Sequence, residues 1–257
     1  MSVITLTTDF GNSPYRGIME GVILGLNPKA TIVDLTHGIS PQNILEAAFV
    51  IHIAHPYFPP DTIHVIVVDP EVGTQRRSVV LRTSKTFFVC PDNGILSYIL
   101  NGKSRLTSGM QAVSLTNARF WLMDTRSTFA GRDVFAPVAA HLSLGVPLMK
   151  LGEEIKSLFS FPLTRPEHGE DYIVGHVIYV DHFGNLITDI KRSDPPSKEL
   201  EVVVGDLRIR GISSSYSAGD IVALWDSSDN LEIAARGGNA GRLLNKGEGD
   251  NIYLRWE

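Results

Sequence analysis

Two aspartates follow predicted β-strands at positions where side chains often meet a ligand. Asp9 comes directly after the strand expected over residues 3–8, and Asp69 after the strand expected over residues 63–68. Ligands of open α/β sheets bind beyond the carboxyl ends of the strands, so we expect both carboxylates to face one crevice. A carboxylate accepts hydrogen bonds from sugar hydroxyls, and its pairing with Arg76 in the same loop can hold a polar nucleophile or a water molecule. A role in helix caps or turns fits these positions equally well.

Three further polar segments group side chains that can contact a ligand. Residues 127–133 precede a predicted helix, whose dipole favours a carboxylate in the first turn. Asp181, Phe183 and Asn185 lie in one segment, and a carboxylate, an aromatic ring and an amide together can hold a base and its sugar. Residues 227–232 form a similar polar segment before a strand. Each of the three is also explained as an ordinary helix entry or turn.

Several familiar sequence devices are absent or misleading. No glycine-rich dinucleotide motif or phosphate-binding loop occurs, so nucleotide binding cannot rest on either. Residues 9–11 copy a kinase tripeptide without the other kinase motifs, and no nucleophile elbow marks a hydrolase serine. His52 and His55 share a predicted helix and would need His64 or Asp61 to complete a metal site. Ordinary structural histidines explain them better, so we expect no metal site.

The elements that must position these residues fall into two regions. The first alternates strands and helices, which is typical of βαβ units on a mostly parallel sheet. Its elements are expected at residues 3–8, 15–26, 31–36, 44–57, 63–68, 78–83, 86–90 and 134–144. The second holds short β-type runs between turn residues, at 172–180, 186–190, 200–204, 221–225, 231–235 and 252–256. We therefore predict an N-terminal α/β domain over residues 1–161, a linker over 162–171, and a small all-β, barrel-like C-terminal domain over 172–257.

The composition is that of an ordinary globular protein and excludes some classes of partner. The 257 residues are 43% hydrophobic and 20% charged, with a formal net charge of −5. Nucleic-acid binding needs a basic face to neutralise phosphates, so we expect no nucleic-acid partner. We also expect no membrane segment and no signal peptide, because no apolar run is long enough for either. With Cys90 as the only cysteine, we expect a cytoplasmic protein without disulfides that binds a small molecule.

Seven short segments together resemble those of one enzyme family. They are Thr7–Gly11, Ile32–His37, Val68–Arg77, Pro91–Gly94, Thr128–Asp133, Asp181–Asn185 and Leu231–Ala234. They occur in the order found in the S-adenosyl-L-methionine (SAM) hydroxide adenosyltransferases, also called SAM hydrolases, which are relatives of the SAM-dependent fluorinase and chlorinase. The resemblance spans nearly the whole chain and implies the same layout, an α/β domain followed by a small β domain.

The resemblance implies a reaction at the 5′-carbon of SAM, in which water or hydroxide displaces methionine and gives adenosine and L-methionine. The leaving group is already positive, so no metal or other cofactor is implied. Asp69 and Arg76 match two of the three family residues that position the water. Ala130 stands where the family has histidine, and a methyl group neither accepts a proton nor orients water. Loss of a general base costs a factor of about 10²–10⁴, so we expect slow hydrolysis with intact binding.

The resemblance also implies which residues contact the substrate and how the chains assemble. It makes Asp9 the acceptor for the ribose hydroxyls and places Asp69 near the 5′-carbon. The other implied substrate contacts come from both domains and are Phe10, Phe129, Asp181, Phe183, Asn185, Ser227, Glu232 and Ala235. Family members are homotrimers whose sites lie between the α/β domain of one subunit and the β domain of its neighbour, and we expect the same assembly here.

Three other functions stay open at the level of sequence. A halogenase would use chloride or fluoride in place of water, but the halide enzymes lack the pair formed here by Asp69 and Arg76. A non-catalytic sensor of SAM or adenosine is made more credible by Ala130. A generic α/β protein with purely structural turns would bind neither SAM nor adenosine.

Overall fold

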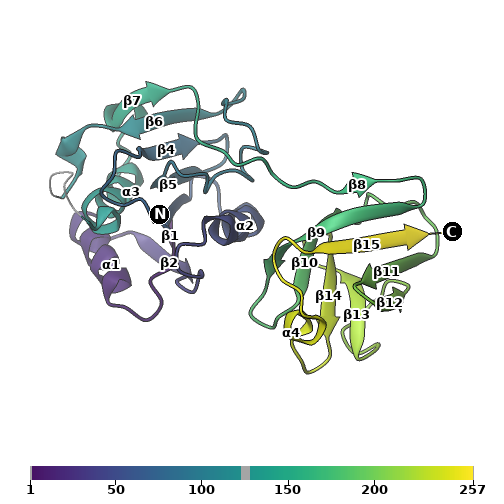
Figure 1. Ribbon diagram of the computed structural model, residues 1–257. Coiled ribbons are helices and arrows are strands. Elements are labelled where there is room, and N and C mark those ends of the chain that lie inside the picture. Colours follow the sequence, from purple (N-terminus) through teal and green to yellow (C-terminus); the bar gives the residue numbers. More distant parts are fainter. Residues whose placement is uncertain (1, 123–127, 257) are drawn as a thin grey trace. The chain divides into compact units, whose positions relative to one another are not determined.

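The computed structural model describes residues 2–122 and 128–256, which belong to two compact units. Unit 1 is Met1–Leu163 and unit 2 is Thr164–Glu257. Each unit has its own sheet and its own apolar core (Figure 1). Among the described residues, no helix is long and apolar enough to cross a membrane.

Unit 1 is built on a seven-stranded mixed sheet in the order β2-β1-β3-β5-β4-β6-β7. The strands β2, β1, β3 and β5 pair in parallel, whereas β4, β6 and β7 are added antiparallel. The strand bounds are β1 Val3–Thr8, β2 Thr31–Thr36, β3 Ile63–Val67, β4 Ser78–Arg82, β5 Phe87–Pro91, β6 Gln111–Leu115 and β7 Gly152–Ile155. The carboxyl ends of the parallel strands therefore meet at one edge, where Asp9 and Asp69 follow β1 and β3.

Helices cover both faces of this sheet. Helices α1 (Tyr15–Leu26) and α3 (Ala136–Ser143) pack over one core, while α2 (Ile44–Ala54) packs over the second. Alternate residues of β3 contribute to the two cores, because Val65 and Val67 face the first core whereas Ile66 faces the second. The short helical turns are η1 His55–Tyr57, η2 Ala118–Phe120, the π-helical η3 Gly131–Phe135 and η4 Leu148–Lys150. Burial on both faces fits the central strand β3, in which four of the five residues are apolar.

Local sequence signals set the limits of α2. The Asn43 side chain accepts the Glu46 N–H at 3.0 Å, and the Glu46 carboxylate accepts the Ser40 N–H at 2.9 Å. The first bond caps the start of the helix, and the second ties the loop before it to the first helical turn. The expectation of one α-helix to residue 57 is wrong in its last turn. Pro56 has no N–H to donate within an α-helix, and the chain continues there as the 3₁₀ turn η1.

Unit 2 is an antiparallel β-structure with one short helix. The strand order is β12-β11-β15-β9-β10-β14-β13, with β8 added to β9, and the end strands β12 and β13 approach each other to give a nearly closed barrel. The bounds are β8 Glu167–His168, β9 Tyr172–Val180, β10 Leu186–Lys191, β11 Leu200–Val204, β12 Leu207–Arg210, β13 Ile221–Trp225, β14 Asn230–Ala235, α4 Ala240–Leu244 and β15 Asn251–Trp256. Alternate apolar side chains of these strands fill the interior.

The fold class expected from the sequence is confirmed, because an α/β unit precedes an all-β, barrel-like unit. The sequence patterns missed the strands β6, β7, β8 and β12 and the helix α4. Strand β7 contains Glu153 and Glu154 and lies at the sheet edge, so it lacks the apolar run that marks a buried strand. Helix α4 is a five-residue helix, too short for its apolar spacing to be recognised.

Candidate functional site

The Asp69 and Arg76 side chains form an ion pair beyond the end of β3. Arg76 Nε lies 2.9 Å from both carboxylate oxygens of Asp69, and Arg76 Nη2 also donates to Asp69 Oδ2. The Arg76 side chain is 8% exposed and the Asp69 side chain 5% exposed, so little water competes for these hydrogen bonds. The two residues therefore act as one fixed unit at the edge of the sheet.

Arg76 retains donor capacity beyond this pair. Its Nη1 donates to the Arg77 carbonyl at 3.0 Å and to Ser78 Oγ at 2.9 Å, and its guanidinium carbon lies 5.5 Å from the centre of the Phe135 ring. A guanidinium carries five N–H groups, and one on Nη2 has no acceptor within residues 2–122 and 128–256. That N–H can donate to a water molecule or a ligand atom.

Arg76 and Ala130 line the same cavity, which has a volume of about 290 Å³. The other lining residues are Gly73, Thr74, Gln75, Arg77, Ser78, Ser114, Leu115, Trp121 and Val134. Ala130 precedes η3, and its methyl group forms part of the cavity wall. The neighbouring Gly131 has no such room, because an added Cβ would lie 2.9 Å from the Phe129 ring. Residue 130 therefore borders the same space as Arg76, whereas residue 131 is closely packed.

Asp9 has one carboxylate oxygen fixed and one without a partner. Asp9 Oδ2 accepts the Gln42 N–H at 2.9 Å, and Gln42 adopts a positive φ of 66°. Among the described residues, nothing donates to Asp9 Oδ1. Thr8 of β1 is level with Val67 of β3, so Asp9 and Asp69 reach the same edge of the sheet. The free oxygen can accept a hydroxyl of a ligand bound there.

Phe10 and Phe129 belong to a cluster of three aromatic rings. The Phe10 ring lies 5.7 Å from that of Phe129, and the Tyr15 ring lies 5.6 Å from Phe10 and 5.1 Å from Phe129, all edge to face. Tyr15 is 49% exposed and was not among the expected site residues. Its place at the start of α1 gives no sequence signal, because only the fold brings it to Phe129. The cluster forms an apolar surface next to Asp9.

In unit 2, Asp181 and Asn185 bond to each other across the β9–β10 turn. Asp181 Oδ1 accepts the Asn185 N–H at 2.8 Å, and Asp181 Oδ2 accepts from Asn185 Nδ2 at 3.0 Å. Gly184 within the turn has a φ of 84°, and an added Cβ would lie 2.0 Å from Asn239. Only glycine fits there, so the segment is a defined turn that holds its carboxylate in a fixed direction.

Glu232 is a buried carboxyl group without a cation. It is 4% exposed, its Oε2 accepts from Tyr216 Oη at 3.4 Å, and its Oε1 has no partner among the described residues. Burial, together with the negative charges of Asp181 and Asp226, raises the pKa of Glu232 to about 7. Tyr216 and Asp226 were not expected in the site. Tyr216 reaches Glu232 from a serine-rich loop, which only the folded chain reveals.

The remaining expected contacts in unit 2 lie at its surface. Phe183 is 73% exposed, Ser227 is exposed, and Ala235 is half-buried. The Ser227 side chain forms no hydrogen bond within the described part of the chain. These three residues are therefore open to a ligand, but the structure does not join them to Glu232 through any polar contact among the described residues.

The histidines considered as metal ligands are packed as structural residues. His64 is fully buried, shares a 2.7 Å hydrogen bond with Thr5 Oγ1 and stacks on Phe88. Burial lowers the pKa of His64 to about 3, and burial together with His52 and Lys85 lowers that of His55 to about 4. Among the described residues, no group of three or more His, Cys, Asp or Glu side chains can hold a metal ion.

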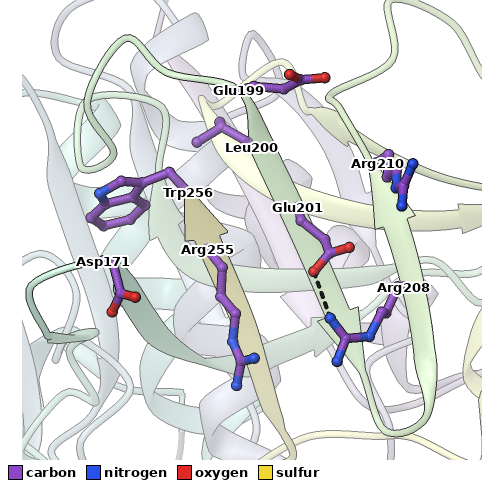
Figure 2. A pocket seen from close by; sticks show the side chains of 8 residues that line it. All are labelled: Asp171, Glu199, Leu200, Glu201, Arg208, Arg210, Arg255 and Trp256. Atoms are coloured by element: carbon purple, nitrogen blue, oxygen red, sulfur yellow. Dashed lines mark hydrogen bonds and ion pairs between the residues drawn. The ribbon is translucent and has the colours of Figure 1, made fainter.

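A second hollow, of about 520 Å³, lies on the outer face of β11, β12 and β15 in unit 2. Figure 2 shows its lining, where Arg208 donates to Glu201 at 3.0 Å. The lining residues are Asp171, Glu199, Leu200, Glu201, Arg208, Arg210, Arg255 and Trp256. None of the expected site residues is among them, so this hollow and the cavity beside Arg76 are different features.

Comparison with known proteins gives a family match for each half of the chain. Residues 4–152 match the family model for the SAM hydroxide adenosyltransferase N-terminal domain, and residues 175–253 match the C-terminal domain. The (R)-S-adenosyl-L-methionine hydrolase of Salinispora tropica is 36% identical, over 98% of this chain and 97% of that protein. The Methanocaldococcus jannaschii enzyme of the same name is 35% identical, over 99% and 96%.

More distant relatives and a solved structure agree with this match. A protein named fluorinase from Nocardia brasiliensis is 28% identical, over 68% of this chain and 66% of its own. The crystal structure of an uncharacterized conserved protein from Thermotoga maritima superposes with a TM-score of 0.88 at 34% identity, covering 98% of this chain and 99% of that one. The sequence matches and the structural match therefore each extend over nearly the whole chain.

Proposed function

The chain belongs to the SAM hydroxide adenosyltransferase family, and we propose that it hydrolyses SAM to adenosine and L-methionine. In this reaction the oxygen of water attacks the 5′-carbon, and the bond from that carbon to sulfur breaks. The electron pair of that bond neutralises the sulfonium, and the attacking water loses one proton. The names of relatives at 35–36% identity support this reaction for the present chain.

The observation that carries the proposal is the buried pair of Asp69 and Arg76 beside a cavity. The pair is held by three hydrogen bonds, and Arg76 keeps one N–H free for a water molecule. Holding a nucleophile in line with the bond that breaks supplies much of the catalysis when the leaving group needs no activation. We propose that Asp69 and Arg76 orient the water, and that Asp9 Oδ1 accepts the ribose hydroxyls.

Ala130 makes this hydrolysis slow in our proposal. The cavity beside Arg76 offers an alanine methyl where the resemblance implies an imidazole. Without that group the proton of the attacking water must leave to solvent, and general-base catalysis worth about 10²–10⁴ is lost. Substrate binding is expected to persist, because Asp9 and the aromatic cluster are in place.

The test is to incubate the purified protein with SAM and to quantify adenosine and L-methionine. Adenosine should form above the background without protein, and it should form equally after treatment with a chelator, because we propose no metal. Asp69→Asn should lower the rate by about 10²-fold, since the amide cannot pair with the Arg76 guanidinium in the same way. Asp220→Asn, at a side chain that is 93% exposed in unit 2, is the matched control and should keep the rate.

A second candidate function is a non-catalytic sensor of SAM or adenosine, which Ala130 favours. Binding by calorimetry with no adenosine release, even after Ala130→His, would support the sensor over the hydrolase. A halogenase is tested in the same assay by adding chloride or fluoride and looking for 5′-halo-adenosine. We expect none, because Asp69 and Arg76 occupy the loop in which the halide enzymes lack this pair.

We also propose that the active form is a homotrimer. The expected ligand groups are divided between the two units, with Asp9 and Asp69 in unit 1 and Asp181 and Glu232 in unit 2. The family resemblance supports sites completed by a neighbouring subunit. Light scattering during gel filtration should give the mass of three chains, and a monomer with full adenosine binding would contradict the proposal.

A further inference from the structure

A chain of hydrogen bonds runs behind the turn that carries Asp9. Thr8 Oγ1 and His37 Nδ1 are 2.8 Å apart, and His37 Nε2 and Asp34 Oδ1 are 2.9 Å apart. Asp34 Oδ2 then lies 3.4 Å from Arg16 Nη1 on α1. Thr8 is fully buried and the His37 side chain is 10% exposed, so the middle of this chain is protected from water. It joins the ends of two parallel strands to the helix between them.

The partners of His37 fix the direction of each bond. The Asp34 carboxylate can only accept from the imidazole, so His37 Nε2 carries a proton, and in this tautomer Nδ1 accepts from the Thr8 hydroxyl. The Thr8 oxygen meanwhile accepts the Phe10 N–H at 3.2 Å. The imidazole therefore orients the hydroxyl that holds the backbone directly after Asp9.

Backbone bonds tie the same two loops together. The Gly11 N–H donates to the His37 carbonyl at 2.8 Å, and the Ile39 N–H donates to the Thr8 carbonyl at 3.4 Å. Gly11 has a φ of 57°, a conformation that glycine adopts without strain. His37 thus contacts residues on both sides of Asp9, through its side chain at Thr8 and through its carbonyl at Gly11.

We infer that His37 is a positioning residue, which sets the Asp9–Gly11 turn so that Asp9 Oδ1 faces the ribose of the bound nucleoside. The inference rests on the proposed function, because it concerns the affinity of that same site. His37 does not touch the reacting atoms, and Thr8 is fully buried, so the Thr8–His37–Asp34 chain is not a nucleophilic triad. Substitution of His37 should therefore weaken ground-state binding. It should raise the Kd for adenosine and the KM for SAM, and it should change kcat little.

Three variants at residue 37 separate the hydrogen bond to Thr8 from the hydrogen bond to Asp34. His37→Asn places an amide oxygen near the position of Nδ1, where it can accept from Thr8, but its side chain does not reach Asp34. His37→Gln reaches Asp34 but leaves the Thr8 hydroxyl without its acceptor. His37→Ala removes both hydrogen bonds. His168→Ala, on the exposed strand β8 of unit 2, is a matched control for loss of an imidazole. Thermal unfolding of each variant reports whether the fold is kept.

The readouts are the Kd for adenosine by calorimetry and the KM and kcat for SAM. His37→Ala and His37→Gln should raise Kd and KM by about tenfold, the cost of a lost hydrogen bond and a mispositioned turn, with kcat within about twofold. His37→Asn and His168→Ala should match the unmodified protein. If His37→Ala does not fold, the contrast between the Asn and Gln variants decides the question.

Two results would overturn the inference. One is unchanged adenosine affinity in both His37→Ala and His37→Gln, and the other is an Asn variant as weak as the Gln variant. Failure of the proposed function looks different, because the unmodified protein would then neither bind adenosine nor release it from SAM. In that case the role assigned to His37 falls together with the site.

Discussion

Asp69 in unit 1 and Glu232 in unit 2 are both buried carboxyl groups, but their surroundings are opposite. Asp69 shares its two oxygens with the Arg76 guanidinium and is 5% exposed. Glu232 is 4% exposed, has a tyrosine hydroxyl as its polar contact, and lies near the negative charges of Asp181 and Asp226. A buried charge needs a partner, which Asp69 has in Arg76, whereas burial of Glu232 without a cation among the described residues raises its pKa to about 7.

The contrast separates a carboxylate arranged for chemistry from one that responds to pH. Ion pairing fixes the direction of Asp69 and leaves Arg76 with a donor to spare, which suits the orientation of a polar nucleophile. Glu232 lacks a cation among the described residues, so it changes charge near neutral pH. A cationic group bound next to it would lower its pKa.

Replacement of the Arg76 guanidinium should have the largest effect on the rate of adenosine formation. Arg76→Lys keeps the positive charge but replaces the planar donor set by a single ammonium, which cannot hold a water beside Asp69 in the position that we propose. In the Ala130→His background, where turnover should be highest, we expect adenosine formation to fall by about 10²-fold. Arg82→Lys, at the end of β4 and outside the cavity, is the control. A loss of less than about threefold in Arg76→Lys would remove Asp69 and Arg76 from the mechanism.

Unit 1 should lose stability towards acid because of its buried histidines. The pKa of His64 is lowered to about 3 and that of His55 to about 4, so both are neutral in the fold but take up protons near pH 6.5 when unfolded. The stabilisation present above pH 6.5 is thus lost as the pH falls towards 4, by about 2 kcal/mol for His64. Amide hydrogen exchange of β3 peptides at pH 7 and pH 4.5 measures this loss.

His64→Phe should flatten this acid response, because phenylalanine keeps the stacking on Phe88 and has no proton to bind. The variant leaves Thr5 Oγ1 without its partner, which should cost about 1 kcal/mol at every pH. His168→Gln, at an exposed imidazole, should keep the response of the unmodified protein. An acid response that persists in His64→Phe would mean that other groups destabilise unit 1.

Unit 2 should respond to pH in the opposite direction and more weakly. The pKa of Glu232 is raised to about 7, so its stabilising contribution is complete below about pH 4.5 and is lost as the pH rises through 7. Partial solvent screening limits this to about 1–2 kcal/mol. Glu232→Gln should abolish the loss between pH 5 and pH 8 in hydrogen exchange of β14 peptides, whereas Glu201→Gln should keep it. A slope that survives in Glu232→Gln would place the titration elsewhere.

The sequence predicted the parts of the site that depend on neighbouring residues. Asp69 and Arg76 lie in one loop, so their pairing follows from a short distance along the chain. Tyr216 and Glu232, or Thr8 and His37, are joined only by tertiary structure, and no spacing rule reveals them. Contacts between residues far apart in the sequence were therefore found only from the structure.

The same distinction applies to the fold. The buried strands β1 and β3 are short and rich in β-branched residues, and they were predicted within about a residue of their bounds. Strand β12 was missed because two of its four residues are arginines, Arg208 and Arg210, that point outward on a sheet edge. Its place is set by antiparallel pairing with β11, which the local sequence does not encode.

The most direct test of the account is the rate of adenosine release from SAM before and after Ala130→His. Residue 130 lines the cavity beside Arg76, and in our proposal the water that Asp69 and Arg76 orient lacks only a proton acceptor. We predict that the substitution raises the rate by about 10²–10⁴ while the Kd for adenosine changes little. An unchanged rate, with adenosine still bound, would contradict hydrolysis at this site and leave the chain as a sensor.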